Sequence, residues 1–225
     1  MRAILLLLGL FAATSAQALS LAQISNKDAG GGLQQALGQG AGKAVDLLGK
    51  SDGFLGNPKV RIPLPQGLQK VEGLLRGIGM GKYADELITS MNRAAEAAVP
   101  EAKALLLASI KQMSWSDAKG ILTGGEDAAT QYFRRTTSAG LTEKFHPVVT
   151  KAMARVKVAE KYDEFAGRAA KFGLVKGQDA HLDDYVTQKA LDGLFLMIAE
   201  EEKAIRKDPL GAAGSLARKV FGALR

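Results

Sequence analysis

The residues best suited to chemistry in this sequence gather in one segment, residues 127–138. Its candidate ligand-binding side chains are Asp127, Gln131, Tyr132, Arg134 and Arg135. On a helix, spacings of three and four residues place Asp127, Gln131 and Arg134 on one face. The adjacent arginines could grip a carboxylate or a phosphate, because the planar guanidinium group matches two oxygens at once. The alternative is a structural network in which both arginines pair with acids of another helix.

A second polar stripe repeats this spacing earlier in the chain. It consists of Asp85, Thr89, Asn92 and Glu96, with Arg93 beside it. Its simplest interpretation is a solvated helix face. The sharper hypothesis is that Asn92, Arg93 and Glu96 meet the arginine pair across a groove between helices and complete a ligand-binding site. In that arrangement, carboxylates such as Asp127 and Glu96 could also act as acid and base.

Other kinds of site have little support in the sequence. The two histidines, His146 and His181, match no metal-binding spacing and there is no cysteine, so no metal site and no cofactor are expected. Neither a phosphate-binding glycine loop nor a nucleophile elbow occurs. The acidic run 200–202 lies close to Lys203 and Arg206, which is typical of charge pairing on a helix surface. No catalytic residue is assigned.

Helices must position these residues. Of the 225 residues, 47% are hydrophobic, and the apolar positions recur at helical spacing. The sequence therefore predicts an all-α fold, a compact multi-helix bundle of about eight or nine short helices with no convincing strand. The expected helices cover residues 33–48, 66–78, 82–98, 149–172 and 181–206, and others begin near Pro100, Ser114, Thr123 and Asp208.

Several helix ends carry local signals. Ser114 with Asp117, and Thr123 with Glu126, form the pattern of a capping box, in which side chains and backbone N–H groups bond reciprocally. Pro147 should kink or end the helix that the second box opens, because proline lacks the N–H that a helix interior uses.

One extended, proline-rich segment is expected near residues 56–65. Proline at positions 63 and 65 removes backbone donors, so the segment cannot pair centrally in a sheet. We expect it to lie over the bundle and to tuck in its apolar side chains, Phe54, Leu55, Val60, Ile62 and Leu64.

The N-terminus has the features of a cleavable signal peptide. Arg2 precedes an apolar run at 4–11, and Ala16-Gln17-Ala18 supplies the small residues that signal peptidase requires. The run is too short to span a bilayer. We expect residues 1–18 to be removed, leaving a single helical domain at 19–225 with a flexible start at 19–32. The expected location is periplasmic or secreted, without a lipid-bearing cysteine.

The net charge of +7 raises the question of an anionic partner. The basic residues are scattered, which is typical of a solvated surface. In the predicted last helix, Arg218 and Lys219 lie opposite Leu216 and Val220, a pattern that suits an anionic membrane surface or docking on the bundle. Nucleic acid is not an expected partner of an exported protein.

Four stretches resemble one family of bacterial proteins. They are residues 53–65, 91–96, 117–138 without 125–127, and 185–195 with 200–202. Over residues 24–222 the chain resembles the uncharacterised exported family catalogued as domain of unknown function 4197. The resemblance implies an export signal and a helical fold. It implies no activity and no site residues.

These observations leave three hypotheses for function. The first is a ligand- or partner-binding module of the cell envelope, which is not an enzyme. The second is an envelope hydrolase that uses carboxylates in a groove between helices. The third is a membrane-surface protein that acts through its basic C-terminal helix. An unknown envelope partner or a small ligand is expected in the first case.

Overall fold

The computed structural model describes residues 26–66, 69, 76–77, 81–154 and 181–208 of the chain. The predicted all-α class is confirmed, because every regular element in these ranges is a helix. The elements are α1 (Asn26–Leu48), α3 (Gly81–Ala98), the single-turn 3-10 helix η2 (Val99–Glu101), α4 (Ala102–Lys111), α5 (Trp115–Thr123), α6 (Ala128–Met153) and α8 (Leu182–Lys207).

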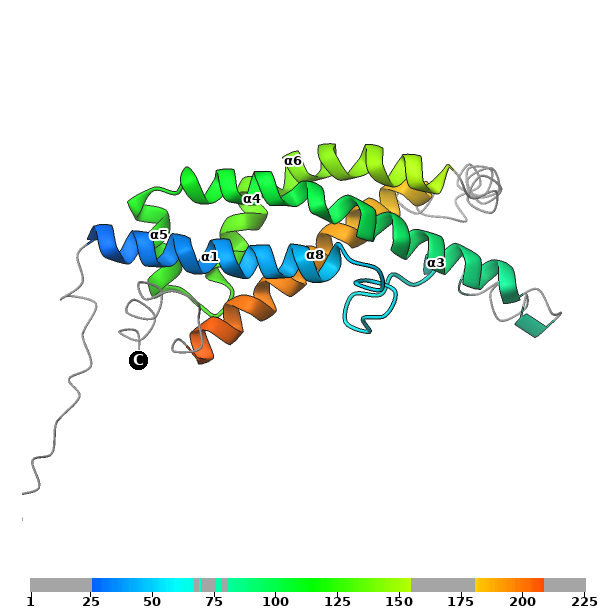
Figure 1. Ribbon diagram of the computed structural model, residues 1–225, viewed down its shortest axis with the longest axis horizontal. Helices are drawn as coiled ribbons and strands as arrows, with labels where there is room; N and C mark the ends of the chain where they lie inside the picture. Colours follow the sequence, from blue (N-terminus) through cyan, green and yellow to red (C-terminus); the bar gives the residue numbers. More distant parts are fainter. Residues whose placement is uncertain (1–25, 67–68, 70–75, 78–80, 155–180, 209–225) are drawn as a thin grey trace, which may run out of the picture.

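Helix α8 lies at the centre of the structure. It packs against α6, α1 and α3, and α6 also packs against α3, α4 and α5. In Figure 1 the blue helix α1 lies across the orange half of α8. Fully buried side chains from different helices meet in this core, among them Met91 of α3, Phe133 and Phe145 of α6, and Phe195 of α8. Removal of this apolar surface from water is the main force that holds the helices together.

The number of helices differs from the expected eight or nine. The described ranges hold six α-helices and one 3-10 turn. Of the two outcomes expected at Pro147, a kink or the end of the helix, the second is excluded, since α6 continues through it to Met153. Val149 and Met153, beyond the proline, are buried, and this packing outweighs the lost backbone hydrogen bond. Most of the helices predicted at 66–78 and 149–172, and the one predicted after 208, lie outside the described residues.

Helix α1 begins earlier than predicted. The glycine triplet at 30–32, expected in a flexible segment, lies within α1, which starts at Asn26. Ala29 and Leu33 on either side of the triplet are buried, at the spacing of one helical turn. Tertiary packing therefore compensates the poor helix propensity of glycine, which costs about 1 kcal/mol per residue relative to alanine. The predicted signal peptide lies outside the described residues.

The segment between α1 and residue 66 contains turns and bends, and its residues 61–65 belong to no helix or strand. Phe54, Val60, Ile62 and Leu64 are buried and Leu55 is half-buried, which confirms that the segment packs onto the bundle. Phe54 lies against Gly193 of α8, where a Cβ atom would come within 2.7 Å of the ring. Only glycine at this position lets the aromatic ring approach the helix so closely.

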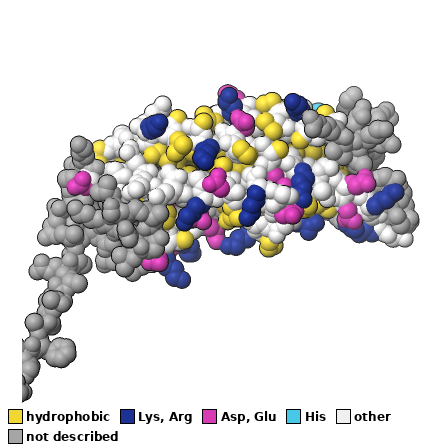
Figure 2. Space-filling view, in the orientation of Figure 1, with side chains coloured by type: hydrophobic (Ala, Val, Ile, Leu, Met, Phe, Trp, Pro, Cys, Tyr) yellow, Lys and Arg dark blue, Asp and Glu magenta, His cyan; other side chains and the backbone are white. Residues whose placement is uncertain are grey.

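The surface has a mixed charge pattern. Figure 2 shows lysine and arginine side chains interspersed with aspartate and glutamate over the visible face. This distribution agrees with the scattered basic residues of the sequence. None of the helices in the described ranges is both long and apolar enough to span a membrane.

A buried hydroxyl offers a test of the packing. Within the described residues, the Oγ1 atom of Thr187 in α8 is buried and has no hydrogen-bond partner. Replacing Thr187 by valine should raise the free energy of unfolding by about 1 kcal/mol, because an unsatisfied buried hydroxyl is destabilising. Thr130 is the matched control. Its buried hydroxyl donates to Glu202 at 2.9 Å, so Thr130→Val should lower that free energy. Urea denaturation of both variants checks the signs; equal effects would contradict the prediction.

Candidate functional site

Asn92 of α3 is fully buried and holds the extended segment in place. Its side-chain amide donates to the carbonyl oxygen of Ile62 at 2.9 Å and accepts from the N–H of Ile62 at 2.8 Å. The amide also donates to the carbonyl oxygen of Ile88, one turn earlier, at 2.8 Å. A single side chain thus satisfies both backbone groups of Ile62. Asn92 is part of the scaffold and faces no open groove.

Glu96, one turn further along α3, is buried and binds the same segment. Its Oε1 atom accepts from the N–H groups of Phe54 and Leu55 at 3.0 and 3.1 Å. Its Oε2 atom accepts from Arg93 at 2.7 Å. Arg93 also donates to Asp52 at 2.8 Å, and these contacts with Glu96 and then Asp52 raise the pKa of the guanidinium. Both carboxylate oxygens of Glu96 are therefore engaged by the protein itself.

The second polar stripe is not the uniformly solvated face of the simplest interpretation. Asp85 and Thr89 are exposed, but Asn92 and Glu96 are buried beneath the segment that they bind. Exposed Asp85 pairs with Arg76 at 2.6 Å, and hydrogen bonds from Arg76 lower the pKa of this carboxyl group. Three residues of the stripe thus bind parts of the chain that precede α3.

The candidate residues of α6 point to different places. Asp127 and Gln131 are exposed and bond to each other at 2.9 Å. Tyr132 is buried and donates its hydroxyl to the carbonyl oxygen of Ser109 at 2.8 Å. Among the described residues, no hydrogen bond or ion pair joins these side chains to Asn92 or Glu96.

Arg135 forms an ion pair with an acid of a neighbouring helix. It donates to Asp117 of α5 at 2.8 Å, and its guanidinium group lies over the ring of Tyr132. Asp117 also completes the predicted capping box with Ser114, which is confirmed. The hydrogen bonds from Ser114, and then the charge of Arg135, lower the pKa of Asp117. For Arg135, this contact matches the alternative hypothesis, in which the arginines pair with acids of another helix.

Arg134 differs from its neighbour. It is half-buried, and the centre of its guanidinium group lies 4.6 Å from the ring centroid of Phe195. Within the described residues, no acceptor lies within hydrogen-bonding or ion-pair distance of it. In contrast, Arg93, Arg135 and Arg206 each pair with a carboxylate. Of the two adjacent arginines, Arg135 therefore has an acid partner, whereas the N–H donors of Arg134 bond to no described residue.

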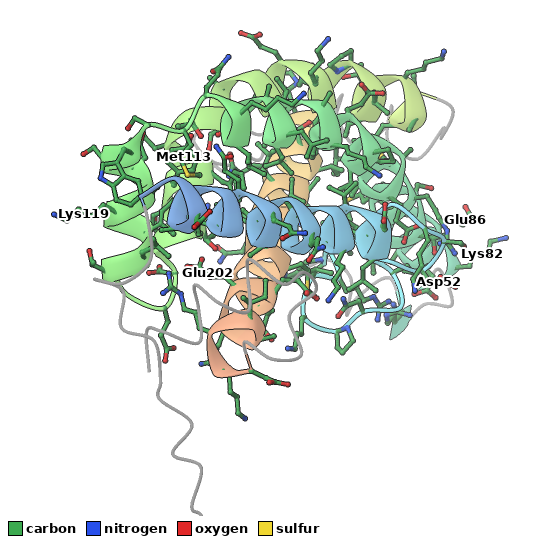
Figure 3. The ribbon with its side chains drawn as sticks, turned by 60° about the vertical axis from the view of Figure 1, so that its left-hand side comes forward. Asp52, Lys82, Glu86, Met113, Lys119 and Glu202 are labelled. Carbon is green, nitrogen blue, oxygen red and sulfur yellow. The ribbon has the colours of Figure 1, made fainter. Side chains whose placement is uncertain are left out.

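Among the described residues, the carboxylate with the most hydrogen bonds is that of Glu202 of α8, which the sequence predicted only as half of a surface pair with Arg206. Glu202 is 5% exposed and lies at the start of α6, where it is labelled in Figure 3. Its oxygens accept from the N–H groups of Ala129 and Thr130 at 3.0 and 2.9 Å. Arg206 binds the same carboxylate at 2.9 Å and also donates to the carbonyl oxygen of Ile121.

Glu202 replaces the second predicted capping box, which was wrong. Thr123 belongs to the end of α5 and donates to the carbonyl oxygen of Lys119, while Glu126 pairs with Lys203. The first free N–H groups of α6 instead bind a carboxylate that is more than 70 residues away. The charge of Glu202 also suits the positive end of the helix dipole. The four-residue spacing of Glu202 and Arg206 predicted an ion pair, but it did not indicate that the pair is buried.

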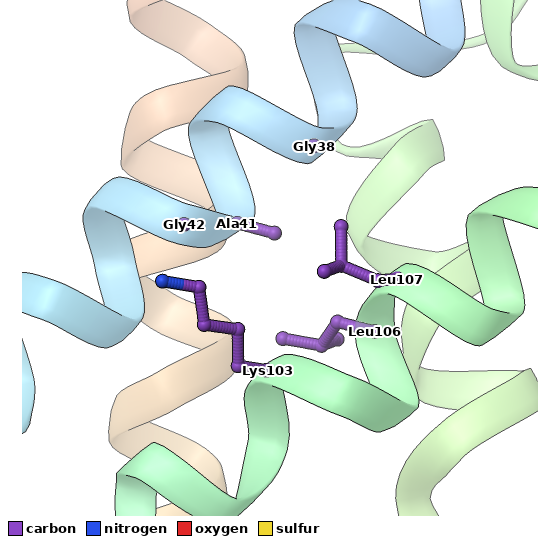
Figure 4. A pocket seen from close by; sticks show the side chains of 6 residues that line it. All are labelled: Gly38, Ala41, Gly42, Lys103, Leu106 and Leu107. Carbon is purple, nitrogen blue, oxygen red and sulfur yellow. The ribbon is translucent and has the colours of Figure 1, made fainter.

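The described residues line two hollows, and both are small. One lies between α1 and α4 and is shown in Figure 4; it is lined by Gly38, Ala41, Gly42, Lys103, Leu106 and Leu107. Its volume is about 20 Å³, and that of the other, between α1, α6 and α8, is about 10 Å³. Volumes of this size have room for a water molecule at most. Neither hollow can hold an organic ligand.

One group of side chains has the composition of a metal site. His146 of α6 lies beside Asp183 and Asp184 in the first turn of α8, with its Nε2 atom 3.5 and 3.1 Å from their carboxylate oxygens. Thr150 donates to Asp183 at 2.9 Å. These residues are partly exposed and lie at the end of α6 opposite to Glu202.

The fold and these contacts define an all-α protein in which two buried carboxylates and a buried amide hold distant segments together. The family model described as Protein of unknown function (DUF4197) matches residues 23–222, so the chain belongs to this family. The resemblance seen in the sequence is thereby confirmed. No significant match was found among the curated proteins or among the solved structures.

Proposed function

We propose that this protein is an exported module of the bacterial cell envelope that binds an anionic group of a partner or small ligand at Arg134. The observation that carries the proposal is the half-buried guanidinium group of Arg134, which stacks on Phe195 and has no acid partner in the described part of the chain. The other candidate residues are engaged in contacts within the protein.

Stacking on Phe195 prepares Arg134 for this role. Phe195 is 1% exposed, so its ring is a rigid support. Stacking uses the flat face of the guanidinium group and leaves the N–H donors at its edge available. A carboxylate or phosphate could accept two of them at once, and such charge-assisted bonds are stronger than neutral ones. The fixed orientation would reduce the entropy lost on binding.

The hydrolase hypothesis has less support than binding. Both oxygens of Glu96 accept hydrogen bonds from the protein, and Asp127 is exposed and bonded to Gln131. An acid and base pair would require two carboxylates that converge on one substrate. The membrane hypothesis depends on residues 209–225, which lie outside the described ranges.

Replacement of Arg134 by glutamine should abolish anion binding while leaving the fold intact. We expect inorganic phosphate or citrate, added at constant ionic strength, to raise the melting temperature of the wild-type protein, because a ligand that binds only the folded state stabilises it. The rise should persist in Arg135→Gln, the matched control, and disappear in Arg134→Gln. Without the anions, Arg134→Gln should cost no more than about 1 kcal/mol, the value of an exposed cation–π contact.

Two outcomes would contradict this assignment. One is a wild-type melting temperature that neither anion changes, or that rises equally in Arg134→Gln. The other is a loss of several kcal/mol in Arg134→Gln without anions, which would indicate a structural role. Native mass spectrometry of protein from its own host would identify a bound ligand. The same spectrum tests export, since removal of residues 1–18 leaves a chain that begins at Leu19.

A further inference from the structure

Helices α6 and α8 bring a histidine and two aspartates together at one end of the molecule. One ligand atom from each of His146, Asp183 and Asp184 lies within 4.8 Å of the others. The histidine precedes the aspartates by 37 and 38 positions, so the cluster depends on the packing of two helices. In Figure 1 the yellow-green end of α6 lies beside the yellow start of α8.

Local structure holds these side chains in place. His146 and Thr150 are one turn apart on α6, and both contact Asp183. One oxygen of Asp183 accepts from Thr150, and the other accepts from the backbone N–H of Asp184 at 3.0 Å. Hydrogen bonds of this kind orient carboxylate ligands around a metal ion. The cluster therefore has a supported carboxylate and differs from a chance group of surface acids.

The two distances from His146 fit a small tetrahedral ion, and the two carboxylate oxygens lie within 4.8 Å of each other. Zinc binds histidine nitrogen and carboxylate oxygen at about 2.0–2.2 Å, which places neighbouring ligand atoms about 3.3 Å apart. The Nε2 atom of His146 lies 3.5 Å from Asp183 and 3.1 Å from Asp184. With a neutral imidazole, the two carboxylates carry two negative charges, which a divalent cation would balance.

We propose that His146, Asp183 and Asp184 form a binding site for a divalent transition-metal ion of the zinc type. Three protein ligands leave a fourth position open for water or for a group from a partner. Magnesium fits poorly, because it prefers an octahedron of oxygen ligands and binds nitrogen weakly. This inference is independent of the anion site at Arg134 and departs from the sequence, which predicted no metal site.

Calorimetry with zinc tests the site on the full mature chain, prepared without a histidine tag. The wild-type protein should bind one zinc ion per chain. His146→Ala and Asp184→Asn should each weaken binding at least tenfold, since each removes one of three ligands. His181→Ala is the matched control, because it removes the only other histidine of the chain and should leave the affinity unchanged. Circular dichroism of each variant verifies that the helices remain.

Three results of this experiment would overturn the proposal. If the wild-type protein shows no saturable zinc binding below the millimolar range, the cluster is only an ion pair between a protonated histidine and two acids. Unchanged affinity in His146→Ala, or an equal loss in His181→Ala, would place zinc elsewhere. If magnesium competes as well as zinc, the histidine is not a ligand and the proposal is wrong.

Discussion

The variant Glu202→Gln is expected to lower the free energy of unfolding by about 3–5 kcal/mol, the cost of removing one partner of a buried ion pair. The side chains of Glu202 and Arg206 are 4% and 16% exposed, so water cannot replace the lost contact. The amide nitrogen would also replace one of the two oxygens that accept from Ala129 and Thr130, so one of these N–H groups would face a donor. The start of α6 would then lose half of its cap.

The two preceding glutamates provide controls for this variant. Glu201→Gln affects an acid whose nearest ion-pair atom, in Lys43, is 3.6 Å away, and Glu200→Gln affects an exposed acid that pairs with Lys59. Surface pairs contribute at most about 1 kcal/mol. Urea denaturation of the three variants should therefore isolate Glu202. If all three variants lost similar stability, Glu202 would be an ordinary surface acid.

The variant Asn92→Ala should have the second-largest effect, a loss of about 2–4 kcal/mol. It removes all three hydrogen bonds of a fully buried side chain and leaves both backbone groups of Ile62 without partners. An unsatisfied buried group costs about 1–3 kcal/mol. Because Asn92 holds the extended segment, limited proteolysis of the variant should also cut within residues 51–65 before the helices unfold.

Thr89 is the control for Asn92. It lies on the same stripe of α3 but is exposed, so Thr89→Ala should change stability by less than about 0.5 kcal/mol and leave the protease pattern unchanged. Equal protease resistance of Asn92→Ala and the wild-type protein would contradict the role of Asn92. In that case Glu96, through its bonds to Phe54 and Leu55, would be sufficient to hold the segment.

Both predictions concern buried polar side chains that bind the backbone of distant segments. Helix α3 uses Asn92 and Glu96 to bind a segment that cannot form a helix or a strand. Helix α8 uses Glu202 to cap α6, whose own preceding residues make no cap. Three of the eight candidate ligand-binding residues, Asn92, Glu96 and Tyr132, therefore satisfy backbone groups, as buried polar side chains must. Among the described residues, the side chains of Arg134 and His146 are two that bond to no backbone group.

Local physical chemistry was sufficient for the elements whose signals are short in range. The helical spacing of apolar residues located α3 at 81–98 and α8 at 182–207 within one residue of the expected bounds. The Ser114 capping box and the burial of Phe54, Val60, Ile62 and Leu64 also followed from neighbours in the chain. The family match agrees with motifs read from the residues alone.

Long-range packing decided the rest. Glu202 and Asn92 each have one partner four residues away, but their other partners, and both acids beside His146, lie 30 or more residues away, where local sequence patterns give no signal. Local propensity also failed at Pro147 and at the glycines of α1, where burial of neighbouring side chains outweighs the intrinsic preference of the backbone. Which polar groups are buried is a property of the tertiary structure. The residues alone determined an all-helical chain of this family, and the packing of its helices determined which of its described charges are paired within the protein.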